Sequence, residues 1–201
     1  MSRRVFDKLT SAAGVVIVVV LLVTGGLLAW GQSFANSSVH NQLAQQQIFF
    51  PPAAAFAHPK VGTEITPSMV PSVSQYAGQQ LLTGQQAEVW ANDFIAVHLS
   101  EMPYHGVYSL ISTAARANPK NTQLTALEQT SFQGTTLRGL LLEAYGFSVI
   151  GAVMFWAMIA SFILAAIMSV LVGLGLWHTT RTTQEKQLLS SRPAPTPVAV
   201  A

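Results

Sequence analysis

Two long uncharged stretches dominate the hydrophobic pattern of this sequence. The first covers residues 12–30 and is rich in Val and Leu, and the second covers residues 147–177. A membrane-crossing helix needs about 20 apolar residues to traverse hydrocarbon about 30 Å thick. The first stretch matches that length, whereas the second exceeds it, which predicts tilt or a protruding end. Both end in a tryptophan, Trp30 and Trp177, a residue that favours the membrane interface.

The segment between the two stretches begins with polar residues and a proline-rich interruption. Residues 32–47 are polar and are expected to extend the first stretch as a helix. Residues 48–73 hold several prolines, which remove backbone donors and favour extended geometry, so we predict an ordered, non-helical loop. Its apolar side chains either cap a domain core or enter the bilayer surface; they are Ile48, Phe49, Phe50 and Phe56.

Helical periodicity resumes after the loop. Apolar residues at helical spacing predict a helix that contains Gly78 and Gly84 and ends at Pro103. A second, short helix is predicted over residues 107–117, stopped by the Asn-Pro pair that follows.

A third helix is predicted to begin at Asn121 or Thr122, either of which is a suitable cap, and to break at Gly134. From Thr135 the apolar pattern runs into the second stretch as one long helix. The side chains expected to face inward are Leu124, Leu127 and Phe132.

These patterns predict an all-α membrane protein in which two transmembrane helices flank a mostly helical extracytoplasmic domain. The second span continues outward as one long helix. The expected order is a cytoplasmic N-terminus (1–11), a first span (12–30), the outer domain (31–146, with its loop at 48–73), a second span (147–177) and a disordered cytoplasmic tail (178–201).

Basic residues set the expected orientation. Three precede the first stretch, three follow the second, and only four lie in the long segment between them. The positive-inside rule then places both termini in the cytoplasm of a multi-pass cell-membrane protein. The terminal basic residues are Arg3, Arg4, Lys8, Arg181, Lys186 and Arg192.

Residues 2–8, SRRVFDK, leave three interpretations of the first stretch open. They resemble the twin-arginine export motif S-R-R-x-F-L-K, with Asp7 in place of Leu. Ser33 and Ala35 offer a small-x-small cleavage site for a signal peptide. The apolar stretch is longer than a typical signal core, which favours a retained anchor.

Composition agrees with a membrane protein. Half of the residues are hydrophobic and 9% are charged, against about a quarter charged in a typical soluble domain. The net charge of +2, without a basic cluster, argues against nucleic-acid binding. The absence of cysteine excludes disulfides, thiolate metal sites and a cysteine nucleophile. We expect no cofactor, and the lipid bilayer as the main partner.

One cluster has the composition of a metal site. His98 and Glu101 lie three residues apart, hence on one helix face, and His105 follows the turn at Pro103. Two imidazoles and a carboxylate are ligands that zinc or non-haem iron accepts. The spacing matches no standard metalloprotease motif, and a helix-end His or Glu commonly binds backbone carbonyls or water. We therefore predict no metal site and no enzyme.

Small residues recur every four positions along the second stretch, a pattern that lets helices approach closely in lipid. They are expected to pack against the first span or against another subunit or membrane protein. The five positions are Ala157, Ser161, Ala165, Ser169 and Gly173.

The layout, together with the segments GQQLLTGQQAEVWANDFIAVHL, RANP and FQGTTLRGLLLEAYGF, resembles a group of uncharacterised two-span membrane proteins of actinobacteria. The resemblance covers roughly residues 12–177 and implies a bacterial protein whose middle faces the cell envelope. Some members are labelled aromatic ring-opening dioxygenases. Such an enzyme requires an iron triad, for which only His98, Glu101 and His105 qualify, so we do not adopt that label.

The most consistent hypothesis is a non-enzymatic accessory component of a membrane complex, acting through a membrane-protein partner or homo-oligomer at the second span. The alternative is an extracytoplasmic ligand-binding domain that signals through a partner, with a pocket lined by Trp90, Tyr104 and Tyr108. A metal-dependent enzyme is the third. The sequence identifies neither the partner nor the ligand.

Overall fold

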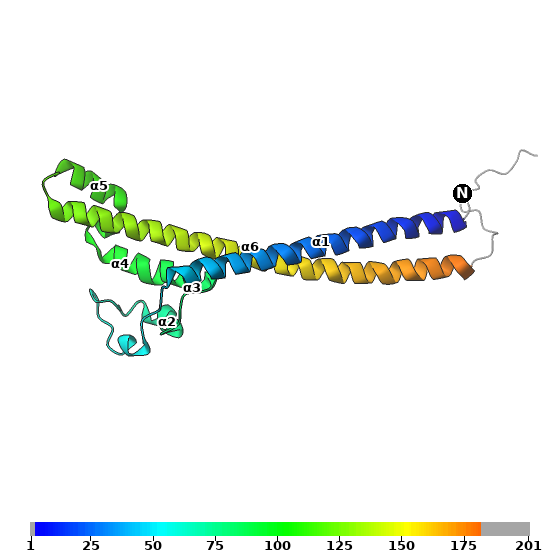
Figure 1. The fold of residues 1–201 in the computed structure, drawn as a ribbon, viewed down its shortest axis with the longest axis horizontal. Coiled ribbons are helices and arrows are strands. Elements are labelled where there is room, and N and C mark those ends of the chain that lie inside the picture. Colours follow the sequence, from blue (N-terminus) through cyan, green and yellow to red (C-terminus); the bar gives the residue numbers. More distant parts are fainter. Residues whose placement is uncertain (1–2, 182–201) are drawn as a thin grey trace, which may run out of the picture. The chain divides into compact units, whose positions relative to one another are not determined.

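The computed structural model describes residues 3–181 and divides into two compact units (Figure 1). Unit 1 comprises the residues up to Ala29 and those from Phe155 onward; unit 2 comprises Trp30–Met154. Apart from a single bridge between Phe49 and Gln80, every regular element in the described range is a helix, which confirms the all-α prediction. Residues 178–181 of the predicted disordered tail are helical and form the end of α6, whereas the rest of that tail, from position 182 onward, lies outside the described residues.

Two long helices contain the two apolar stretches. Helix α1 (Arg3–Gln46) includes the first stretch and continues through the polar segment, as predicted, and α6 (Thr122–Arg181) includes the second. Both are apolar and long enough to cross a membrane. Only 11% of the most apolar window of each helix is buried, whereas the core helix of a soluble protein is mostly buried.

Helix α6 begins earlier than predicted and is not broken by Gly134. Its start is capped as expected, because Asn121 Oδ1 accepts the backbone N–H groups of Gln123 and Leu124 at 3.1 and 3.2 Å. Glycine costs a helix only about 1 kcal/mol. A Cβ at Gly134 would lie 2.8 Å from Leu99 Cδ2, so this glycine provides room for a packed leucine.

In unit 1, the segments of α1 and α6 pack along a seam whose buried or half-buried positions advance alternately by three and four residues. An average step of 3.5 residues is the period of left-handed helix pairing. The seam positions are Ser11, Gly14, Val18, Leu21 and Gly25 on α1, and Ser161, Ala165, Met168, Val172 and Gly175 on α6.

Glycines on α1 allow the close approach at this seam. A Cβ at Gly14 would lie 2.5 Å from Val172 Cγ2, and one at Gly25 would lie 2.8 Å from Phe162 Cε1. Ser161 Oγ donates to the backbone oxygen of Leu21 at 2.7 Å. Bulky α6 side chains therefore rest directly on the α1 backbone.

In unit 2, three consecutive helical segments pack against α6 and the end of α1 (Figure 1). They are α3 (Gly84–Val89), the π-helical η3 (Trp90–Ile95) and α4 (Ala96–Glu101). The core that they share with α1, α6 and the preceding loop consists of Val39, Leu43, Phe50, Met69, Val73, Leu81, Ala87, Ala91, Ile95 and Leu141.

The predicted end of this helical stack is correct, but its predicted start is wrong. Thr83 caps α3 in a capping box: its Oγ1 accepts from Gln86 N at 3.2 Å while Gln86 Oε1 accepts from Thr83 N at 3.0 Å. Gly78 lies before the helix with φ +71°, a value that most side chains disfavour. Gly84 is the first helical residue, and a Cβ there would collide with Ser148.

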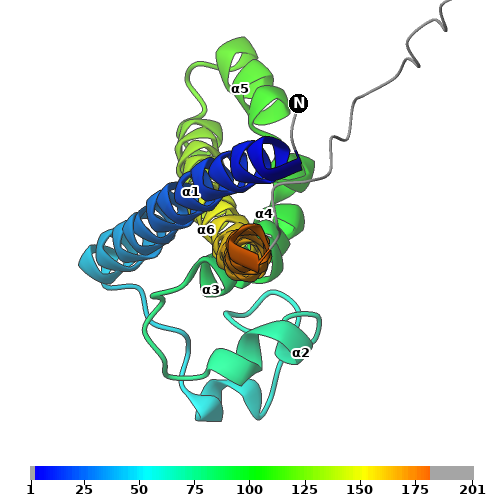
Figure 2. The ribbon, with the colours of Figure 1, turned by 90° about the vertical axis from the view of Figure 1, so that its right-hand side faces the viewer.

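The predicted loop at 48–73 is irregular over most of its length but contains two short helical turns, η1 (Ala53–Phe56) and α2 (Val70–Val73), with η2 (Ser74–Tyr76) directly after it. Figure 2 shows α2 and the surrounding loop on the same side of α6 as α3. Phe50 is 2% exposed, and Ile48 and Phe56 pack against the core. Phe49, 57% exposed, is the exception among the four predicted apolar anchors.

A left-handed turn, η4 (Pro103–Gly106), connects α4 to α5 (Tyr108–Ala117). Tyr104, His105 and Gly106 have φ values of +58°, +53° and +66°. Two consecutive non-glycine residues in this region cost about 1–3 kcal/mol each. Ser131 Oγ of α6 donates to the Gly106 oxygen at 2.7 Å and is fully buried, so the turn is fixed from outside.

Replacing Gly106 by alanine should destabilise unit 2 by about 2–4 kcal/mol, because the new Cβ combines backbone strain with a collision against the Leu99 carbonyl. Gly62 has φ +80° but open space around it, so Gly62→Ala isolates the strain and should cost about 1 kcal/mol. Thermal unfolding followed by circular dichroism in mild detergent measures both. Equal shifts in Tm would contradict the predicted collision.

Candidate functional site

The three candidate metal ligands lie near one another in sequence but do not form a site. His98 Nδ1 lies 2.8 Å from the Phe94 carbonyl oxygen, and its ring packs edge-on against the Phe94 ring. Glu101 and His105 are exposed to solvent. Within residues 3–181, no three His, Cys, Asp or Glu side chains are grouped closely enough to hold a metal ion.

The three aromatic residues proposed to line a ligand pocket lie in different clusters. Trp90 packs between Phe50 and Phe94, with ring centroids 5.0 and 4.2 Å apart, as part of the unit 2 core. Tyr108 contacts Phe132 instead, at 5.6 Å. Tyr104 is exposed on the left-handed turn. The predicted aromatic pocket is therefore not formed by these side chains.

The five small residues of the second stretch do not share one environment. Ser161 and Ala165 are buried at the unit 1 seam and Ala157 is half-buried, but Ser169 and Gly173 are exposed. A row of residues spaced by four advances about 40° around a helix at each step, because one turn takes 3.6 residues. The row therefore rotates out of a seam whose contacts recur every 3.5 residues.

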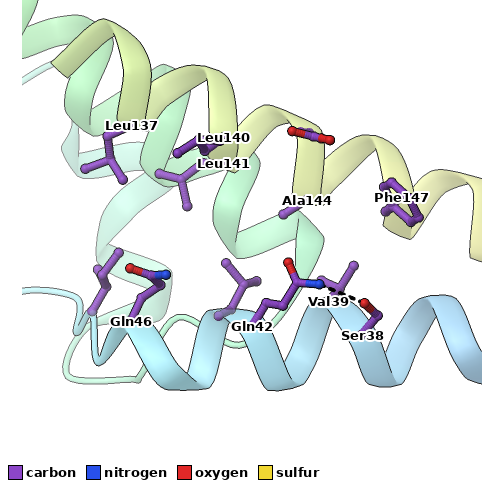
Figure 3. Close-up of a pocket in the computed structure, with 12 residues that line it drawn as sticks. Ser38, Val39, Gln42, Gln46, Leu137, Leu140, Leu141, Ala144 and Phe147 are labelled. Atoms are coloured by element: carbon purple, nitrogen blue, oxygen red, sulfur yellow. Dashed lines mark hydrogen bonds between the residues drawn. The ribbon is translucent and has the colours of Figure 1, made fainter. Parts of the chain in front are cut away.

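A groove of about 390 Å³ lies between α1 and α6 in unit 2. Figure 3 shows Val39 and Gln42 of α1 facing Leu137, Leu140 and Ala144 of α6 across it. Val39, Leu43 and Leu141 are buried and form its floor. Leu140 and Phe147, at 58% and 45% exposed, form its outer wall.

The groove exists because the other side of the α1–α6 pair is filled. Ala87, Ala91 and Ile95 of the α3–η3–α4 stack belong to the same core as Leu43 and Leu141. These helices therefore pack against both α1 and α6 from one side, while the groove on the other side remains open. The site is thus a consequence of long-range packing.

Polar groups are confined to the rim. Gln42 Nε2 donates to Ser38 Oγ at 2.9 Å, and Gln46 contributes a second amide. Glu143 is the only ionisable residue among the groove's lining residues, which include no Lys, Arg or His. The groove therefore combines an aliphatic interior with an uncharged or weakly acidic edge.

The sequence alone indicates neither the groove nor its lining. The apolar wall of the groove belongs to the predicted long apolar helix, which contains Leu137, Leu140 and Phe147. The two amides, Gln42 and Gln46, belong to the predicted polar extension of the first stretch. Amides at positions i and i+4 opposite an apolar face are the only local signal. That signal does not reveal which two helices face each other.

No protein-family model matches the chain, and neither the curated proteins nor the solved structures show a significant similarity to it. The resemblance to two-span actinobacterial proteins therefore stays a prediction.

Gly25→Leu should disrupt the unit 1 seam, because Phe162 occupies the space that the new side chain needs. Gly26→Leu is the matched control, since nothing lies within 4 Å of a Cβ there. The readout is disulfide formation between Ser11→Cys and Gly175→Cys, since a Cβ at position 175 lies 3.0 Å from Ser11 Oγ. The chain has no other cysteine to interfere.

We expect Gly25→Leu to lower the yield of this disulfide at least about fivefold, consistent with the cost of overpacking, and Gly26→Leu to leave it unchanged. A disulfide that joins two chains instead of closing within one would show that the seam is intermolecular and would contradict the observed packing.

Proposed function

We propose that the chain is a non-enzymatic, two-span integral membrane protein. In this proposal unit 1 is the membrane anchor, unit 2 is an extracytoplasmic helical domain, and both termini are cytoplasmic. Unit 2 acts as an accessory component of a larger membrane complex. The bacterial origin implied by the sequence resemblance belongs to the same proposal.

The exposure of apolar side chains on both helices of unit 1 carries the proposal. Val16, Val20 and Val23 of α1 and Ile163 and Val170 of α6 are all more than half exposed. Exposing such a surface to water is unfavourable by about 25 cal/mol for each Å². Contact with lipid avoids this cost, and the pairing of the two helices covers the small polar surface that remains.

Tryptophans support a membrane interface at the boundary of the two units. Trp30 of α1 and Trp156 of α6 each lie next to the division between unit 1 and unit 2 in their own helix. They are 69% and 68% exposed, so neither serves the core. Exposed indoles favour the level of the lipid headgroups.

An accessory role is supported by an apolar patch around the η4 turn of unit 2, here named the tip patch. It surrounds the left-handed turn, whose strained backbone conformation sets the directions of the side chains. Exposed aromatic groups of this kind are typical of protein contact surfaces. The tip patch consists of Tyr104, Val107, Tyr108, Leu110 and Phe132.

The orientation predicts which engineered cysteines react with a membrane-impermeant maleimide. Ser109→Cys, on exposed α5, should be labelled in intact cells, and Lys8→Cys, before the first span, should be labelled only after permeabilisation. The cysteine-free parent is the control. The opposite labelling pattern would overturn the orientation, and release of the protein by alkaline carbonate would overturn the membrane anchor.

Phe132→Glu should reduce co-purification of a partner from mild detergent at least about tenfold, since buried aromatic anchors dominate interface energies. Gln133→Glu adds the same charge at the neighbouring exposed position and should have little effect. Quantitative mass spectrometry of the purified complexes gives the ratio. A lone monomer in the parent, or equal losses in the two variants, would count against the accessory role.

A further inference from the structure

We propose that the groove between α1 and α6 in unit 2 binds one acyl chain of an amine-bearing phospholipid, with the headgroup ammonium beside Glu143. This inference rests on the proposed function, since a bilayer next to unit 2 supplies the lipid.

The dimensions and lining of the groove suit a single hydrocarbon chain. Its volume of about 390 Å³ lies in the range of small-molecule sites, which begins at about 300 Å³. The floor of Val39, Leu43 and Leu141 is aliphatic and presents no side-chain polar group. A hydrocarbon chain needs no hydrogen bonds, so it can occupy this floor without leaving a polar group unpaired.

The groove is continuous with an apolar surface that runs along the same helix. Leu140 and Phe147 are seven residues apart and Ile150 follows three residues later, so the three share one face of α6. Ile150 is 49% exposed. The wall of the groove thus continues into the beginning of the predicted second span, which provides an apolar path for a chain that enters from the bilayer.

Charge selects the headgroup. Glu143 is exposed and lines the groove, where no basic side chain accompanies it. An anionic headgroup would meet repulsion from this carboxylate and find no cation. A headgroup with an ammonium would gain an attractive contact with it, and the Gln42 and Gln46 amides can bind its phosphate or ester oxygens.

The test uses the full-length protein in phosphatidylcholine vesicles that contain a small fraction of phosphatidylethanolamine or phosphatidylglycerol with a diazirine on the acyl chain. After irradiation, mass spectrometry locates the labelled peptides. We expect the ethanolamine probe to label residues 38–46 and 137–147, and to do so more strongly than the glycerol probe.

Two variants block the groove from opposite walls. Ala144→Phe fills it from α6, and Gln42→Trp covers it from α1. Each should reduce groove labelling at least about fivefold, whereas Val153→Phe, on α6 but outside the groove, should not. Glu143→Gln should lower the ratio of ethanolamine to glycerol labelling about threefold, the size expected of an exposed charge contact. Circular dichroism confirms that the variants are folded.

Groove labelling that survives both blocking variants would overturn the site. Equal labelling by the two probes, unchanged in Glu143→Gln, would overturn the choice of headgroup. Resistance to alkaline carbonate separates these results from failure of the proposed function: a membrane-embedded protein with an unlabelled groove overturns this inference alone.

Discussion

The absence of side chains at a few positions of α1 and α6 sets how closely the two helices approach within each unit. In unit 1, Gly14 and Gly25 accept Val172 and Phe162. In unit 2, a Cβ at Gly31 would lie 2.9 Å from Met154 Sδ, and one at Gly151 would lie 2.9 Å from Asn36 Oδ1. If unit 1 lies in lipid, as proposed, the bilayer gives no hydrophobic drive for its two apolar helices to associate, and van der Waals contact at Gly14 and Gly25 would hold the pair together.

Unit 2 uses the same helix pair for a different purpose. The α3–η3–α4 stack packs against both helices from one side, and the shared core includes Ala91, Ile95 and Leu141. The π-helical turn of η3 places Trp90 against both Phe50 and Phe94. Local π-helical turns recur at functional positions in helices. Here the turn lies in the layer whose one-sided packing leaves the groove open.

Local signals in the sequence predicted the helical elements, and long-range packing decided the rest. Pro103 and Asn121 act through their own backbone geometry, so the end of α4 and the start of α6 were predictable. The capping box at Thr83 has the sequence T-x-x-Q, which is itself a local signal for the start of α3. Gly134 stays helical because Leu99, distant in sequence, packs on it. The groove depends on which helices face each other, and periodicity within one helix carries no such information.

The 3.5-residue repeat of the unit 1 seam also restricts how this protein can change in length. One residue inserted into α1 after Val18 would turn everything beyond it by about 100° and carry Gly25 away from Phe162. Seven residues inserted in both helices would restore the phase and lengthen the pair by about 10 Å. Related chains that keep this seam should therefore differ in length by whole heptads, matched in the two helices.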